Sequence, residues 1–117
     1  MKHLAAITRD IKGRSWTFKL LSDRVFDKIH NPEGDEGNTG MTIFSRYEVH
    51  FSKSEWDLVD IRHEIAHIFF FMSNTGSAEL TALQTEETMC EIFGSNALEM
   101  CVHADVVAEC FLNYHKD

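Results

Sequence analysis

The chain has 117 residues, of which 44% are hydrophobic and 26% are charged, and its formal net charge is −8. This length fits one compact domain with a single core, and the composition excludes an intrinsically disordered chain. Nineteen acidic residues against eleven basic ones, with no basic run, argue against nucleic-acid binding and against a basic membrane-surface patch.

The amino terminus and the cysteines indicate the cellular compartment. The apolar patch at residues 4–7 is too short for a signal peptide, and the longest apolar run, IFFFM at 68–72, is too short to cross a bilayer. Cys90, Cys101 and Cys110 have no paired spacing, which favours reduced thiols over a disulfide framework. We therefore expect a soluble, cytoplasmic protein that forms one domain over residues 1–117.

The first half of the chain alternates between strand and helix patterns. Residues 15–21 alternate apolar and polar side chains, which predicts a half-buried strand. Residues 22–30 predict a short helix capped by Ser22 or Asp23. Residues 31–40 contain the only proline and three glycines and predict a loop, and residues 41–51 predict one continuous strand.

The second half is predicted to be helical. Ser-x-x-Glu at residues 52–55 has the form of a capping box, and from Trp56 to Met72 the apolar residues recur every three or four positions, as in an amphipathic helix. A second capping box at 81–84 starts a further helical region, with a break or kink expected at 94–96 and a final helix at 98–114. This order of elements predicts a small α+β domain.

Residues 63–67 read His-Glu-Ile-Ala-His, which is the H-E-x-x-H pattern. Residues four apart on a helix share one face, so His63 and His67 can bind one metal ion while Glu64 acts on a water molecule beside it. The apolar neighbours of His67 indicate that this imidazole is buried, and a buried imidazole needs a partner. The alternative is a helix whose polar face carries two solvated histidines.

A catalytic zinc ion usually has three protein ligands and one open position. The segment at 84–94 offers Glu86, Glu87 and Glu91 as sources of the third ligand, and Glu87 and Glu91 share one helix face. A donor that stabilises the oxyanion is also needed, and no pattern selects one; the candidates are His103, Tyr114, Tyr47 and Arg46.

The two histidines with Glu64, followed by Glu87-x-x-x-Glu91, resemble the gluzincin branch of the zinc metallopeptidases. Residues 41–95 are similar to short metallopeptidase-like proteins of bacteriophage and bacterial genomes. The resemblance implies a minimal zincin-like domain, in which a small sheet packs on an active-site helix followed by carboxy-terminal helices. It also implies that Glu87 is the third zinc ligand and that Glu91, where the group usually has aspartate, orients His63.

These observations predict a zinc-dependent metallopeptidase in which Glu64 is the general base and the substrate is a peptide or protein. A catalytically silent zinc-binding module that binds or inhibits a host or partner protein is the alternative. A third interpretation is a metal-free interaction domain in which the motif is accidental.

Overall fold

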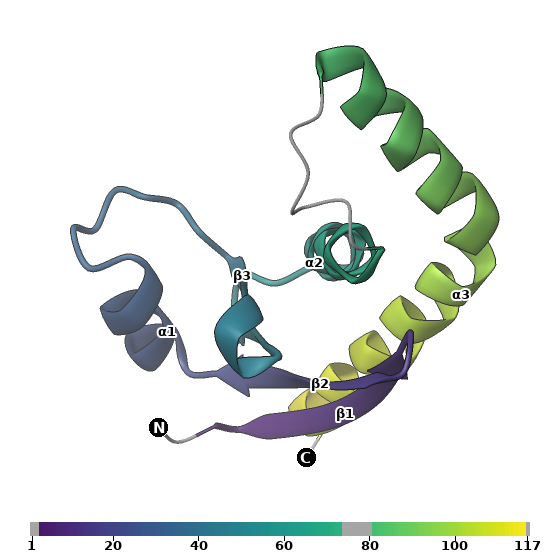
Figure 1. Cartoon of the computed structure of the whole chain (residues 1–117). Helices are drawn as coiled ribbons and strands as arrows, with labels where there is room; N and C mark the ends of the chain where they lie inside the picture. Colours follow the sequence, from purple (N-terminus) through teal and green to yellow (C-terminus); the bar gives the residue numbers. More distant parts are fainter. Residues whose placement is uncertain (1–2, 74–80, 117) are drawn as a thin grey trace.

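The structure is a computed structural model that describes residues 3–73 and 81–116. Within these residues, four strands and three α-helices follow one another, with a short 3₁₀ turn between the third and fourth strands (Figure 1). The elements are β1 (Ala5–Ile11), β2 (Arg14–Leu21), α1 (Asp23–His30), β3 (Gly40–Ile43), the 3₁₀ turn (Phe44–Arg46), β4 (Glu48–Ser52), α2 (Leu58–Met72) and α3 (Ala82–Lys116). The predicted α+β class is confirmed.

The four strands form one mixed sheet in the order β1-β2-β4-β3. β1 and β2 are an antiparallel hairpin, closed by Lys12 and Gly13, which both have positive φ, as a two-residue hairpin turn requires. β4 pairs in parallel with β2 and antiparallel with β3. β3 is therefore an edge strand, directly beside the strand that leads to α2.

The core lies between one face of the sheet and the two later helices. Figure 1 shows α2 lying over the sheet, while α3 begins far from the sheet and reaches it with its carboxy-terminal half. Burying large apolar side chains between these layers is the main stabilising contribution to such a domain. The fully buried residues of this cluster come from β1, β2 and β4, from α2, and from the last turns of α3: Ile11, Trp16, Phe18, Leu20, Val49, Phe51, Ile61, Ile65, Ile68, Ala104, Val107 and Phe111.

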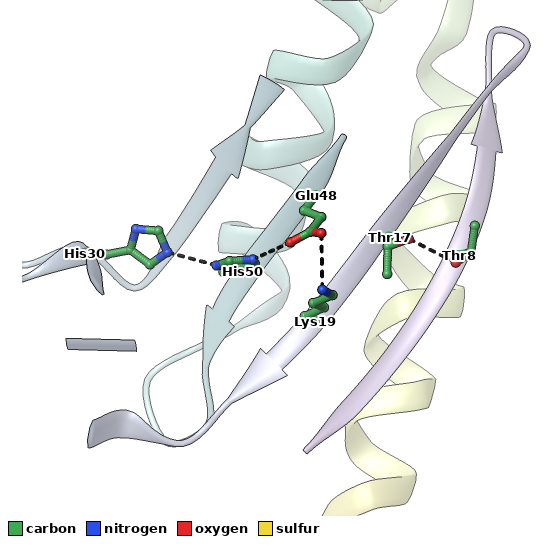
Figure 2. A network of polar contacts seen from close by, with 6 residues as sticks. All are labelled: Thr8, Thr17, Lys19, His30, Glu48 and His50. Atoms are coloured by element: carbon green, nitrogen blue, oxygen red, sulfur yellow. Dashed lines mark hydrogen bonds and ion pairs between the residues drawn. The ribbon is translucent and has the colours of Figure 1, made fainter. Parts of the chain in front are cut away.

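A row of polar side chains crosses the opposite face of the sheet, where α1 lies against β4 (Figure 2). Two 3.0 Å contacts extend from the fully buried His50: its Nε2 meets Glu48 Oε1, and its Nδ1 meets His30 Nε2. A carboxylate only accepts hydrogen bonds, so His50 Nε2 donates to Glu48 and His50 Nδ1 accepts from His30. Lys19 completes the row with a 3.2 Å ion pair to Glu48. These contacts tie the end of α1 to β4 and β2.

Three features of the fold differ from the sequence-based predictions. Residues 41–51 are two strands rather than one, because the chain reverses through the 3₁₀ turn and Tyr47, which has left-handed backbone geometry with φ of 55°. β1 has no counterpart among the predicted elements. The expected break at 94–96 is absent, because α3 is one continuous helix in which Asn96 donates a hydrogen bond to the carbonyl of Ile92 and accepts one from Lys12, although the axis of α3 bends in the middle of the helix (Figure 1).

Within residues 3–73 and 81–116, every helix is too short or too polar to cross a bilayer.

Candidate metal centre

α2 carries the predicted metal-binding motif. Asp57 caps this helix, with its side chain accepting from the backbone N–H of Asp60 while Asp60 accepts in return from that of Asp57. The helix therefore begins at Leu58, and the expected capping box at 52–55 is wrong because Ser52 ends β4. Asp60 is thereby engaged in capping.

The two histidines of the motif lie side by side on the outer face of α2. His63 Nε2 and His67 Nε2 are 3.1 Å apart, and the ring planes are nearly perpendicular at 81°. This contact is either an N–H···N hydrogen bond or the approach of two nitrogens that would share a cation. Two nitrogens bound to one tetrahedral zinc ion at 2.0–2.1 Å are about 3.3 Å apart. The pair therefore fits zinc with little rearrangement.

Glu64 is the third member of this group. One of its carboxylate oxygens and one ring nitrogen from each histidine all lie within 4.8 Å of one another, and no other group of three such residues occurs in the described part of the chain. The Glu64 side chain is only 9% exposed, in contrast to the His63 side chain, which is 65% exposed. Thr42 Oγ1 donates a 2.7 Å hydrogen bond to Glu64 Oε1, and Glu64 Oε2 lies 3.8 Å from His63 Nε2.

An apolar cavity of about 380 Å³ adjoins the histidines, between α2 and the amino-terminal half of α3. It is lined by His63, Ala66, His67, Phe70, Thr85, Met89 and Phe93. The three residues from α3 are four positions apart, so they mark the face that this helix turns toward the histidines.

The structure does not bring Glu87 or Glu91 to the histidines. Each residue of an α-helix is rotated about 100° from the one before it, so Glu87 lies about 200° around the helix from Thr85. Both carboxylates are exposed and lie outside the metal-binding group and the cavity lining. The roles that the resemblance implies for them, zinc ligand and partner of His63, remain predictions.

The expected burial of His67 is wrong. This side chain is exposed, because the apolar residues around it, Ile65, Ile68 and Phe69, point to the sheet and to α3. An ion at this pair would be open to substrate or to a partner protein.

His103, a candidate oxyanion donor, is engaged elsewhere. Its Nδ1 accepts a 3.0 Å hydrogen bond from Arg9 Nε, and its Nε2 lies 3.6 Å from a carboxylate oxygen of Glu99. Burial lowers the pKa of His103, and the positive charge of Arg9 lowers it further. These contacts attach α3 to β1, so His103 has a structural role.

Thr42 is the residue that the sequence analysis missed. It lies on β3, 22 positions before Glu64, and the contact depends on how the sheet edge packs against α2. No periodicity or spacing in the sequence signals such a pair.

Comparisons of the chain with family models, with curated proteins and with solved structures find no match. The resemblance to metallopeptidases therefore depends on the motif residues, of which the structure places three together.

Proposed function

We propose that the chain is a zinc-dependent metallopeptidase that binds zinc through His63 and His67. The observation that supports this function is the 3.1 Å approach of two exposed Nε2 atoms beside one buried carboxylate. Exposed histidines four apart are common on helices, but a neighbouring glutamate whose side chain is 9% exposed and has a fixed hydrogen-bond donor is not expected on a simple solvated face.

Zinc bound there would acidify a water molecule and polarise a substrate carbonyl. Glu64 would accept a proton at Oε2, the oxygen nearer His63, and then deliver it to the leaving amine. Thr42 would keep Oε1 occupied during both transfers. The apolar wall formed by Phe70, Met89 and other residues of the cavity would exclude water beside the histidines and contact an apolar part of the substrate.

A zinc-binding module without turnover is the second candidate, and the positions of the carboxylates favour it. Glu64 is the carboxylate that the described residues place at the histidines, whereas Glu87 is outside the group. If Glu64 were itself the third ligand, no base would remain for hydrolysis. Such a protein would act by binding a host or partner protein through the exposed metal site.

Metal content after purification tests both candidates against the metal-free interpretation. We expect about one zinc ion per wild-type chain, and loss of that zinc in His63→Ala and in His67→Ala. A wild-type protein that binds no zinc from a buffered zinc solution would refute both candidates.

Glu64→Gln separates the two candidates from each other. If Glu64 is the base, this variant binds zinc with nearly wild-type affinity but loses cleavage of a peptide library. If Glu64 is the third ligand, the zinc affinity itself falls. Glu87→Gln, compared with its neighbour Glu86→Gln as a control of equal charge change, tests whether Glu87 reaches the ion when zinc is present.

A further inference from the structure

Glu64 lies where α2 packs against the edge of the sheet. The carboxylate is nearly buried between α2 and the edge strand β3. A Cβ atom at Gly40 would lie 3.1 Å from Phe51 Cε1 and 3.4 Å from Glu64 Cγ, so the absence of a side chain at Gly40 makes room mainly for the Phe51 ring, with Glu64 at ordinary contact distance. A buried carboxylate must receive hydrogen bonds, because its loss of hydration is otherwise uncompensated.

Thr42 supplies that hydrogen bond. Its hydroxyl, 2.7 Å from Glu64 Oε1, is the only hydrogen-bond donor to this carboxylate among residues 3–73 and 81–116. The other oxygen, Oε2, is the one that lies toward His63, at 3.8 Å from Nε2. The two oxygens therefore have different neighbours, and rotating the carboxylate would break the bond to Thr42.

We infer that Thr42 is a positioning residue for Glu64, holding Oε1 so that Oε2 faces the histidine pair. This inference rests on the proposed function. Thr42 contacts neither histidine in any hydrogen bond of the structure and acts only through the glutamate. Its own position is fixed by the sheet, since it pairs with Val49 in the antiparallel ladder of β3 and β4. Fixing a reactive group by a hydrogen bond from a rigid element preserves the geometry that catalysis needs.

The first test needs no metal and no substrate. Thr42→Val removes the hydroxyl at nearly constant volume, Thr42→Ser keeps a hydroxyl, and Thr8→Val makes the same change at an exposed site of β1, where the hydroxyl meets that of Thr17 at 3.1 Å. In protein treated with a chelator, Thr42→Val should lower the melting temperature by about 4–8 °C. This loss should largely disappear in a Glu64→Met background, and it should be small in Thr42→Ser and Thr8→Val. Equal losses in the wild-type and Glu64→Met backgrounds would overturn the contact.

The second test concerns the site itself. Zinc affinity should stay within about twofold of wild type in Thr42→Val, while kcat for a peptide cleaved by the wild type should fall at least about tenfold with little change in KM. Thr42→Ser should restore most of kcat. Wild-type kcat in Thr42→Val would overturn the positioning role alone. A wild-type protein that binds no zinc or cleaves no peptide overturns the proposed function and the positioning role together.

Discussion

Acidification is predicted to destabilise the protein through the contact between α1 and the sheet. Burial, together with the neighbouring His50, lowers the pKa of His30 from 6.5 to about 4. Burial also lowers the pKa of His50, against the opposing effect of the Glu48 carboxylate. Burial raises the pKa of Glu48, but hydrogen bonds from His50 and Lys19 outweigh it and leave this pKa lowered. Both histidines are therefore neutral in the folded protein near pH 7, with Glu48 ionised.

Acid lowers the stability because the unfolded chain takes up a proton at His30 more readily than the folded protein does. Between pH 6.5 and about 4, an unfolded chain protonates His30 whereas the folded protein resists protonation, so the free energy of unfolding decreases as the pH falls through this window. Lowering the His30 pKa from 6.5 to about 4 corresponds to at most about 3.4 kcal/mol of unfolding free energy. Because His30 is partly exposed and solvent screens its surroundings, we expect about 1–2 kcal/mol, or roughly 5–10 °C in melting temperature.

His30→Gln tests this contribution, because the glutamine amide can still donate to His50 Nδ1 but does not titrate. Melting temperatures of wild type and variant should be measured from pH 7.5 to 4, with His3→Gln as a control at an exposed histidine. The difference between wild type and His30→Gln should change in favour of the variant as the pH falls. Curves that remain parallel over the whole range would refute the role of the His30–His50 pair.

Three further predictions concern the helix that carries the motif and the ion it would hold. Asp57→Ala removes the side-chain cap of α2 and should cost about 1 kcal/mol in urea denaturation, with Asp57→Asn retaining most of the stability. Ile65→Ala leaves a cavity under the sheet and should cost about 2–5 kcal/mol by the same measurement, well above the effect of Val59→Ala at an exposed position of the same helix. Chelation of zinc should lower the melting temperature of wild type but not of His63→Ala, as read by calorimetry, and identical shifts in the two proteins would contradict a stabilising metal site.

Patterns of a few neighbouring residues correctly predicted the features that depend only on those residues, such as helix caps and the buried face of a helix. The apolar stripe of α2 is buried, Ser22 caps α1 as predicted, and Thr81 and Gln84 form the reciprocal hydrogen bonds of a capping box. Each of these features involves residues within four positions of one another. Their geometry depends on helix periodicity rather than on the rest of the chain.

Several features that the sequence did not predict involve interactions between distant segments. Continuity of α3 at Gly94 costs about 1 kcal/mol of helix propensity relative to alanine. Side-chain bonds near this position, such as the 2.7 Å bond from Lys12 in the β1–β2 turn to Asn96, offset that cost. The burial of His50 is a similar case. Alternation along β4 correctly separates its side chain from those of Val49 and Phe51, but the sequence contains no sign that α1 would cover it.

The same distinction between local and long-range interactions applies to the candidate metal site. His63, Glu64 and His67 belong to one helix, so their proximity follows from its 3.6-residue period once the helix forms. A third ligand from α3 depends instead on the rotation of a second helix about its own axis, where each residue of offset turns a side chain by about 100°. The structure turns Thr85 and Met89 toward the histidines, so for Glu87 to reach a bound ion this end of α3 would have to rotate by roughly half a turn or unwind. Zinc titration monitored by circular dichroism distinguishes unwinding of α3 from completion of the site by Glu64 or solvent. If Glu87 binds the ion by unwinding, helix content should fall in wild type but not in Glu87→Gln. If Glu64 or solvent completes the site, the two proteins should give the same spectra with and without zinc.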